Sequence, residues 1–371
     1  MSGPPTTKRT APAAYDGPLL FAVLFLVGIG IVMVYSASSA VALQRYGNDF
    51  YFLKKQALFA GMGICALVAC RHLPYRWLVP LAYPLLTLAL VLLGAVVLSG
   101  QGVTAGGSTR WLRLGPINFQ PSEVARFALV VYLAYSLSRK QTRVKEFSIG
   151  FLPHIIVLAL MCSLILLQPD FGSAVILAAI TWIMLFVGGV RLRHLALALA
   201  VAAPLVVYAA ILEPYRLQRL MVFMDPWSDP TGDGYQITHA LMAFGSGQIW
   251  GSGLGKGMQK LFYLPEPHTD FIFAVIGEEL GLVGVGAILL LYGLIVWRGY
   301  SIARHAADPF AMLLALGLTT ALALQICINM AVTLGLLPTK GLTLPFLSYG
   351  GTSLLMSMAM VGILMNIGAA R

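Results

Sequence analysis

The chain is organised around residues 261–273, which read Leu-Phe-Tyr-Leu-Pro-Glu-Pro-His-Thr-Asp-Phe-Ile-Phe. A polar segment broken by prolines runs here into an apolar helix, and a carboxylate sits at the junction. Thr269 can cap the helix, so that Asp270 falls in its first turn. Unpaired N–H groups and the helix dipole favour an anion at that position.

The apolar run that follows is longer than a bilayer is thick. Residues 270–297 span about 40 Å at about 1.5 Å per residue, against a hydrocarbon core of about 30 Å. We therefore expect one rigid helix with Asp270 above the membrane and Glu278 and Glu279 near its surface. A carboxylate in this position suits a reaction on a lipid-borne substrate or a simple helix cap, and the local sequence leaves both open.

Composition indicates an integral membrane protein. Charged residues make up 10% of the chain and apolar residues 59%, whereas soluble proteins carry about 25% charged residues. The four cysteines lie in apolar runs without ligand spacing, which indicates neither a disulfide framework nor a metal site. The six histidines show no paired spacing, so a zinc site is not expected. The net charge of +10 follows from membrane topology and does not indicate nucleic-acid binding.

The sequence predicts an all-α polytopic membrane protein with ten transmembrane helices. A disordered cytoplasmic tail is expected over residues 1–17, and a single membrane domain over 18–371. The first apolar run resembles a secretory signal, but its length and the segments after it favour an uncleaved helix. The runs are 18–35, 56–70, 78–98, 122–137, 153–167, 171–189, 195–212, 271–297, 310–336 and 344–367.

Basic residues orient the predicted bundle. With the N-terminus inside, the inner segments hold 13 of the 24 basic residues and 3 of the 14 acidic ones. Short basic links at 139–145, 191–193 and 298–304 fit the positive-inside rule. Both termini are therefore predicted to be cytoplasmic. The largest outer loop, between helices 7 and 8, covers about 213–270, and we expect short helices within it, such as 235–244.

Several charges lie at the outer ends of helices, where a charge usually has a partner or a function. Glu123 and Arg126 are three residues apart and can form a structural ion pair on one helix face, or they can line an outward cavity. Asp170 can cap the sixth helix or pair with an outer arginine. Lys340 is the only charge in the loop between helices 9 and 10, where flanking prolines provide a rigid setting.

Other outward cations can form an electropositive funnel for a phosphate-bearing ligand, or each can be solvated separately. The glycine-rich run 251–257 lacks the ending of a phosphate-binding loop, and we interpret it as flexible backbone. The further cations are Arg110, Arg113, Arg216, Arg219, Lys54 and Lys55.

In their order along the chain, these motifs resemble the signature of the SEDS family of bacterial cell-shape, division and sporulation proteins. The resemblance covers essentially all ten expected helices. The loop 337–345, with its lysine, is similar to that of the division members, although Phe262 replaces an acidic residue found in some of them. The motifs are Pro265 to Phe273, Gly277 to Gly281, Arg110-Trp111, Gln120 to Glu123, Gln168 to Asp170, Asp225-Pro226 and Ser348 to Gly351.

The resemblance implies a peptidoglycan glycosyltransferase that polymerises lipid II at the outer face of the cytoplasmic (inner) membrane during cell division. The implied partners are a class B penicillin-binding transpeptidase, other division proteins and membrane lipids, with no nucleic acid. The family's catalytic aspartate maps onto Asp270, as general base for the acceptor sugar hydroxyl. Cations, or a divalent ion such as Mg²⁺ or Mn²⁺ at Asp270, would stabilise the leaving pyrophosphate. The expected substrate-binding residues are Lys340, Arg110, Arg216, Arg219, His268, Glu123, Arg126, Asp170 and Lys55.

Two other functions stay open at the level of sequence. A lipid II flippase would suit ten helices and intramembrane charge pairs, but it requires charges deep in the bilayer, and the helix centres here hold almost none. A non-catalytic scaffold of the division machinery would tolerate loss of Asp270 but not changes to apolar helix faces. A single inverting displacement needs one base and a stabilised leaving group, which favours the enzyme.

Overall fold

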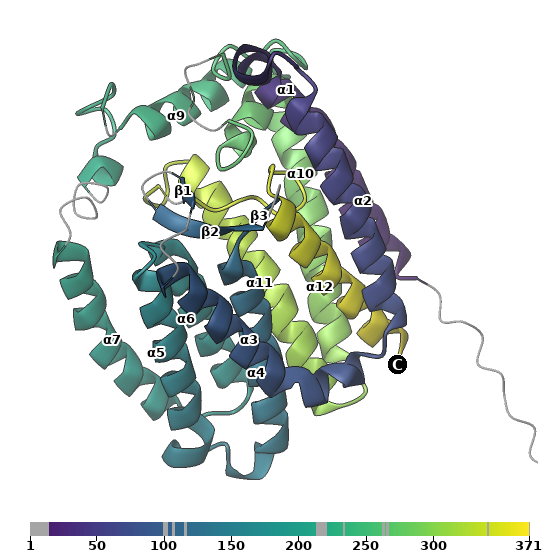
Figure 1. The fold of residues 1–371 in the computed structure, drawn as a ribbon, viewed down its shortest axis with the longest axis vertical. Coiled ribbons are helices and arrows are strands. Elements are labelled where there is room, and N and C mark those ends of the chain that lie inside the picture. Colours follow the sequence, from purple (N-terminus) through teal and green to yellow (C-terminus); the bar gives the residue numbers. More distant parts are fainter. Residues whose placement is uncertain are drawn as a thin grey trace, which may run out of the picture.

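The protein folds as a bundle of long helices (Figure 1). The computed structural model describes residues 15–98, 103–105, 108–114, 117–212, 221–232, 234–261, 264, 267–339 and 341–370. The helices are α1 (Gly17–Tyr46), α2 (Tyr51–His72), α3 (Leu78–Leu98), α4 (Pro121–Arg139), α5 (Leu152–Leu166), α6 (Phe171–Val187), α7 (Leu192–Leu212), α9 (Tyr235–Gly247), α10 (Ile272–Arg304), α11 (Pro309–Thr333) and α12 (Gly351–Ala369).

The protein is a polytopic, mainly helical membrane protein, as the sequence predicts. A helix covers most of each of the ten predicted apolar runs. Within the described ranges, seven helices are long and apolar enough to cross a membrane. α9 confirms the short helix that was predicted within residues 213–270. The predicted tail ends earlier than expected, because Asp16 accepts a hydrogen bond from the Leu19 N–H and caps α1 at Gly17; residues 1–14 lie outside the described chain.

α4, α11 and α12 form the centre of the bundle. Nearly all of α4 is buried, and 67% of the most apolar window of α11 and of α12 is buried, against 22% for α2. α12 packs along α2, and α11 packs along α10 and α4. α7 stands at the edge of the bundle (Figure 1). The three central helices α4, α11 and α12 are therefore enclosed by the other helices of the bundle.

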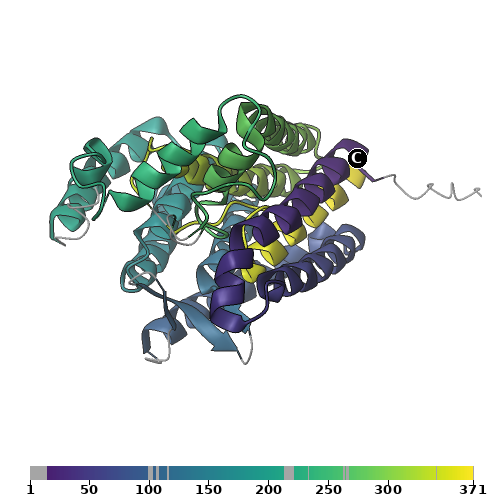
Figure 2. The ribbon, with the colours of Figure 1, turned by 90° about the horizontal axis from the view of Figure 1, so that it is seen from above.

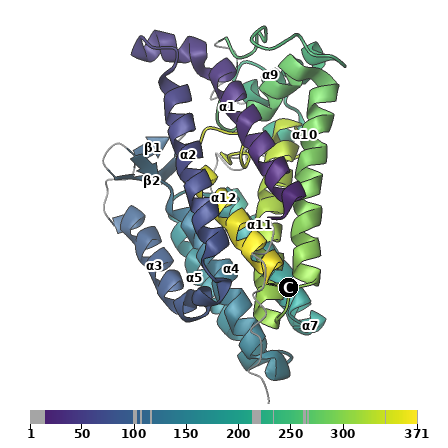
Figure 3. The same ribbon diagram turned by 90° about the vertical axis from the view of Figure 1, so that its right-hand side faces the viewer.

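The two ends of the bundle differ. α9 lies across one end, as the view from above shows (Figure 2). The C-terminus and the beginning of α1 lie at the opposite end (Figure 3). There Arg298, near the end of α10, forms an ion pair with Asp16, with 2.6 Å between Nη2 and Oδ2. An even number of crossings would place both ends of the chain on one side in this way.

The glycine-rich segment before α4 contains a small antiparallel sheet, which the all-α prediction missed. It consists of β1 (Val103–Ala105), β2 (Ser108–Leu114) and β3 (Ile117–Phe119), with β2 in the centre. Side chains alternate between the two faces of a strand, so Arg110 and Arg113 point to opposite sides. The Arg110 side chain is only 14% exposed, whereas Arg113 is exposed.

The last predicted helix begins later than expected, at Gly351 and not at residue 344. Residues 344–350 are almost entirely buried but irregular. Phe346 has a positive φ of 68°, a conformation that a side chain disfavours. Gly30 of α1 allows this segment to approach, because a Cβ there would lie 2.5 Å from the Phe346 carbonyl oxygen. Tertiary contacts therefore override the apolar pattern that predicted a helix.

α10 is interrupted, whereas the sequence predicts one rigid helix. At Gly281 the backbone has φ 65° and ψ −166°. The N–H groups of Leu282 and Val283 donate to the carbonyls of residues 248 and 249, at 2.9 and 3.1 Å. The carbonyls of Glu278 and Glu279 accept instead from the N–H groups of residues 252 and 253. The segment 248–253 thus replaces two hydrogen bonds of the helix and separates its first part, residues 272–280, from the remainder.

We predict that Gly281→Ala destabilises the protein by about 2 kcal/mol or more, because a side chain opposes the positive φ. A Cβ at Gly281 would also lie 2.3 Å from the Gly251 nitrogen. The measurement is thermal unfolding in detergent. The control is Gly286→Ala in the same helix, where a Cβ would meet nothing within 4 Å, and which should unfold at or above the wild-type temperature. Equal melting of Gly281→Ala and wild type would contradict the break in α10.

Candidate active site

Asp270 lies in the turn just before α10, not in its first helical turn. The helix begins at Ile272, and Phe271 occupies the N-cap position without a side-chain cap, so the predicted cap by Thr269 is wrong. The reason is tertiary: the Thr269 carbonyl accepts from Ser348 Oγ at 2.6 Å and the Asp270 carbonyl accepts from Asn329 Nδ2 at 3.0 Å. These bonds hold the backbone from outside the helix. The half-buried Asp270 is therefore placed by neighbouring elements.

The same groups join the 268–270 segment to the 341–349 loop. Asn329, on α11, also donates to the carbonyl of Leu342. Ser348 Oγ accepts from the Leu344 N–H at 2.7 Å, and the Tyr349 N–H donates to the His268 carbonyl at 2.9 Å. Asn329 and Ser348 are 1% and 3% exposed, so water does not compete for these bonds. Two segments far apart in sequence are thereby fixed side by side.

Arg110 and Asp270 converge on Gly341. Arg110 Nη1 donates to the Gly341 carbonyl at 3.2 Å. A Cβ on Gly341 would lie 3.1 Å from Arg110 Nη1 and 3.2 Å from Asp270 Oδ2. A guanidinium and a carboxylate therefore face the same point above the loop, and a glycine leaves room for both.

Asp170 contacts Arg110 and combines the two roles that the sequence left open, a helix cap and a partner for an arginine. Its carboxylate caps α6 by accepting from the Ser173 N–H at 3.1 Å and from Ser173 Oγ at 2.7 Å. The same carboxylate lies 3.7 Å from Arg110 Nη1, with only 3% of the Asp170 side chain exposed. Because Asp170 is fixed at a helix end, it holds the guanidinium in place.

His268 packs between two aromatic rings. Its ring centroid lies 4.4 Å from that of Phe52 and 5.6 Å from that of Tyr349. Burial lowers the pKa of His268 from its ordinary 6.5 to about 4, and the positive charge of Arg45 acts in the same direction. Burial also raises the pKa of Tyr349 to about 12. Both side chains are consequently neutral at pH 7.

Three of the other predicted site residues have contacts of their own, and three lie outside the described residues. Glu123 and Arg126 form a buried ion pair within α4, which confirms that the two side chains pair. Lys55 Nζ donates to the Tyr51 hydroxyl at 2.7 Å, near the start of α2. A contact of these three residues with substrate stays a prediction. Lys340, Arg216 and Arg219 lie outside the described residues.

The described residues do not offer a ready-made site for a divalent metal ion. Within these ranges, His, Cys, Asp and Glu side chains form no group of three that could hold one ion. Mg²⁺ and Ca²⁺ take six or more oxygen ligands, whereas the carboxylate of Asp270 faces the guanidinium of Arg110. Among the described residues, the donor set around Asp270 therefore does not fit a resident divalent ion.

Glu278 and Glu279, which sequence analysis placed near the membrane surface, are buried inside the protein together with Lys260. Glu278 and Glu279 are 2% and 1% exposed, and Lys260 is 6% exposed. The glycine-rich run interpreted as flexible is fixed against them, with positive φ values of 79°, 98° and 80° at positions 251, 253 and 255. The available signal was the close spacing of the glycines in residues 251–257, which suits a backbone that passes close to other groups.

The fold and site define a polytopic helical membrane protein with a carboxylate and a guanidinium meeting at one end of the bundle. The model of the Cell cycle protein family, FTSW_RODA_SPOVE, matches residues 18–371. The chain belongs to this family, which confirms the resemblance seen in the sequence.

Relatives and solved structures match over almost the whole chain. The probable peptidoglycan glycosyltransferase FtsW of Trichlorobacter lovleyi is 49% identical, over 96% of this chain and 94% of its own. Stage V sporulation protein E of Bacillus subtilis is 39% identical over 98% of each chain. A chain from the structure of a peptidoglycan synthase complex that coordinates polymerization and crosslinking is similar with a TM-score of 0.79 and 32% identity, covering 96% of this chain and 98% of that one. The rod shape determining protein RodA of Thermus thermophilus gives 0.71 and 30%, covering 96% and 97%.

We predict that the buried His268 makes the fold sensitive to acid. Its folded-state pKa of about 4 lies below its ordinary 6.5, so between these values the unfolded chain binds a proton that the folded chain does not. Stability should therefore fall as the pH drops from 6.5 to 4, by up to about 3 kcal/mol. The measurement is unfolding in detergent at several pH values, where His268→Gln should show a flatter dependence than wild type. An unchanged dependence in the variant would contradict the assignment.

Proposed function

We propose that this protein is a peptidoglycan glycosyltransferase that polymerises lipid II into glycan strands during cell division. The observation that carries the proposal is the meeting of the Asp270 carboxylate and the Arg110 guanidinium at Gly341. A relative named for this activity matches nearly the whole chain. The arrangement provides a base and a cation on a rigid frame at one end of the bundle, where a lipid-linked substrate can approach from the side.

The proposed reaction is one displacement. The 4-hydroxyl oxygen of the acceptor sugar attacks the anomeric carbon of the donor, and its proton passes to the carboxylate of Asp270. The bond from that carbon to the undecaprenyl pyrophosphate breaks, and the electron pair leaves with the pyrophosphate oxygen. Arg110, held by Asp170, stabilises the charge that develops there. The configuration inverts at the anomeric carbon, so no second carboxylate is needed as a nucleophile.

Further substrate contacts belong to the same proposal. Lys340 precedes Gly341, whose carbonyl binds Arg110, and we assign it a second contact with the pyrophosphate. Arg216 and Arg219, in the largest outer loop, and Lys55, at the start of α2, would guide the anionic substrate towards the site. His268, Glu123 and Arg126 would support the walls of the substrate groove. A divalent ion, Mg²⁺ or Mn²⁺, would enter only with the pyrophosphate oxygens of the substrate.

The proposed setting is the cytoplasmic (inner) membrane, with ten spanning helices in one domain over residues 18–371. Both termini would be cytoplasmic and the site extracytoplasmic. The basic inner links support this orientation. A class B penicillin-binding transpeptidase is the proposed partner, because a similar chain is part of a peptidoglycan synthase complex.

We predict that Asp270→Asn lowers glycan polymerisation by at least about 100-fold, since a general base contributes about 10²–10⁴-fold. The measurement is polymerisation of labelled lipid II in liposomes with the transpeptidase partner present. Binding to the partner and thermal unfolding should match wild type, because the substitution is nearly isosteric. Asp225→Asn, in an exposed turn of the outer loop, is the control and should keep full activity.

Two outcomes would contradict the proposed function. Wild-type polymerisation by Asp270→Asn would show that this carboxylate is not the base. Absence of glycan with the wild-type protein, under conditions where a known polymerase is active, would favour a lipid II flippase or a scaffold.

A further inference from the structure

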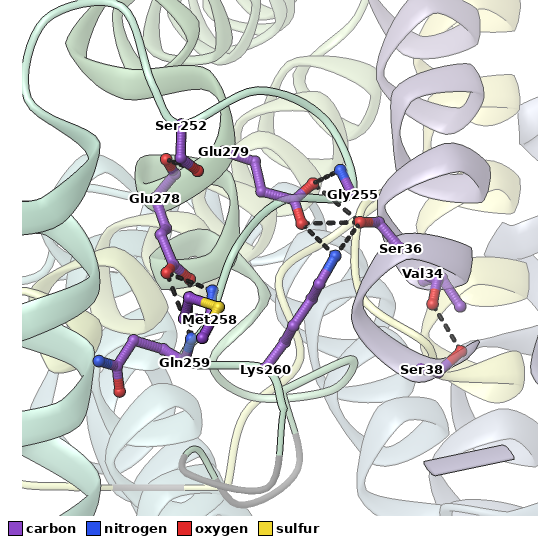
Figure 4. Close-up of polar contacts among 10 residues, drawn as sticks. All are labelled: Val34, Ser36, Ser38, Ser252, Gly255, Met258, Gln259, Lys260, Glu278 and Glu279. Carbon is purple, nitrogen blue, oxygen red and sulfur yellow. Dashed lines mark hydrogen bonds and ion pairs between the residues drawn. The ribbon is translucent and has the colours of Figure 1, made fainter. Parts of the chain in front are cut away.

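A buried ionic cluster lies outside the proposed reaction centre and joins three parts of the chain (Figure 4). Lys260 Nζ lies 2.5 Å from Glu279 Oε1 and donates to Ser36 Oγ at 2.8 Å. Ser36, on α1, donates to both carboxylate oxygens of Glu279 at 2.8 Å. The Gly255 N–H completes the set by donating to Glu279 Oε2 at 3.1 Å. We call Ser36, Lys260 and Glu279 the ionic cluster.

Because the ionic cluster is buried, only a close and fully hydrogen-bonded arrangement of its charges is tolerated. The side chains of Lys260 and Glu279 are 6% and 0% exposed. Two charges removed from water are tolerated only when they meet at close range and their remaining donors and acceptors are satisfied. A buried ion pair often adds little net stability compared with apolar side chains of the same size. What it contributes here is a fixed position for the segments that carry it.

Glu278 binds the same loop from the other side. Its carboxylate accepts from the N–H groups of Met258 at 2.7 Å and Gln259 at 3.2 Å. A Cβ on Gly257 would lie 2.8 Å from Glu278 Oε2 and 3.1 Å from Glu279 Oε1. The loop therefore passes directly over both carboxylates, as the close-up shows (Figure 4).

The two charged members of the ionic cluster flank Asp270 in the sequence. Lys260 precedes the 268–270 segment, and Glu279 follows it on residues 272–280, the part of α10 before the break at Gly281. The ion pair closes a loop of chain with Asp270 midway between its two members. Ser36 then fixes this closed loop to α1. We propose that Lys260 and Glu279 are positioning residues for Asp270, which hold its carboxylate at the distance from Arg110 that the reaction requires. This inference rests on the proposed function.

The protein contains a matched ion pair that serves as a control. Asp16 and Arg298 link the start of α1 to the later part of α10, with 2.6 Å between Oδ2 and Nη2. This pair joins the same two helices as the ionic cluster, but at the other end, and it does not enclose Asp270. A purely structural role predicts that the loss of either pair lowers the amount of folded protein and leaves the kcat of the folded fraction unchanged. A positioning role predicts that only the ionic cluster affects turnover.

The test compares polymerisation of labelled lipid II by three variants of the full-length protein in liposomes with the transpeptidase partner. Lys260→Met/Glu279→Gln removes both buried charges together, so that neither is left unpaired. We expect its kcat to fall at least about 10-fold, with KM changed less than about 3-fold, because ground-state binding is not altered. Lys260→Arg keeps the charge and should recover part of the rate. Asp16→Asn should keep the wild-type kcat.

A second comparison separates positioning from general damage. In the Asp270→Asn background, adding Lys260→Met/Glu279→Gln should lower the residual rate less than 2-fold, because the ionic cluster acts through the carboxylate that is already lost. Full additivity of the two losses would contradict the inference. Ser36→Ala, which keeps the ion pair, covers the case in which the double variant does not fold, and it should lower kcat about 3-fold.

The outcomes also distinguish the inference from the function on which it rests. If Asp270→Asn polymerises like wild type, the proposed function fails. If Asp270→Asn is inactive while Lys260→Met/Glu279→Gln and Ser36→Ala keep the wild-type kcat, the proposed function stands and the positioning role is overturned. An equal loss of kcat in Asp16→Asn would also overturn it.

Discussion

The site depends on one buried amide. Asn329 donates from Nδ2 to the carbonyls of both Asp270 and Leu342, and so joins two segments that are separated by the whole of α10 and α11. Buried carbonyls need a donor, and leaving one unsatisfied costs about 1–3 kcal/mol. Because α11 is central in the bundle, this amide gives the irregular segments around Asp270 a rigid support.

The backbone is irregular at Phe346 and at Gly281, and contacts with other segments compensate for both irregularities. Membrane-depth backbone can leave the helix only where other protein groups satisfy it. Phe346 keeps its positive φ because Gly30 lets α1 approach it. The break at Gly281 is satisfied by residues 248–253, which accept and donate the hydrogen bonds that the helix gives up. The same break creates the short helical segment that carries Glu278 and Glu279, and it thereby connects residues 248–253 to the segment that follows Asp270.

Local sequence patterns predicted the positions of the helices. They did not predict the contacts that segments far away in the chain make with the site. Hydropathy located the helices, and Asp270 was chosen as the candidate base partly because it ends a polar segment before an apolar run. The cap by Thr269 failed because Ser348 and Asn329 bind the backbone from elsewhere in the chain. The break at Gly281 could not be read from helical periodicity, since its partners lie some thirty residues earlier. The burial of Glu279 was missed for the same reason, because its cation is on another element.

The most direct test of this account is to remove the amide of Asn329 and measure glycan polymerisation together with thermal unfolding. Asn366 is the matched control, because it makes similar backbone contacts at the opposite end of the bundle, with the Tyr75 N–H at 2.9 Å and the Arg71 carbonyl at 2.7 Å. The account predicts that Asn329→Leu and Asn366→Leu lose similar stability, but that only Asn329→Leu lowers the polymerisation rate, by at least about 10-fold. Equal rates for the two variants would contradict the claim that this amide places Asp270 for the reaction.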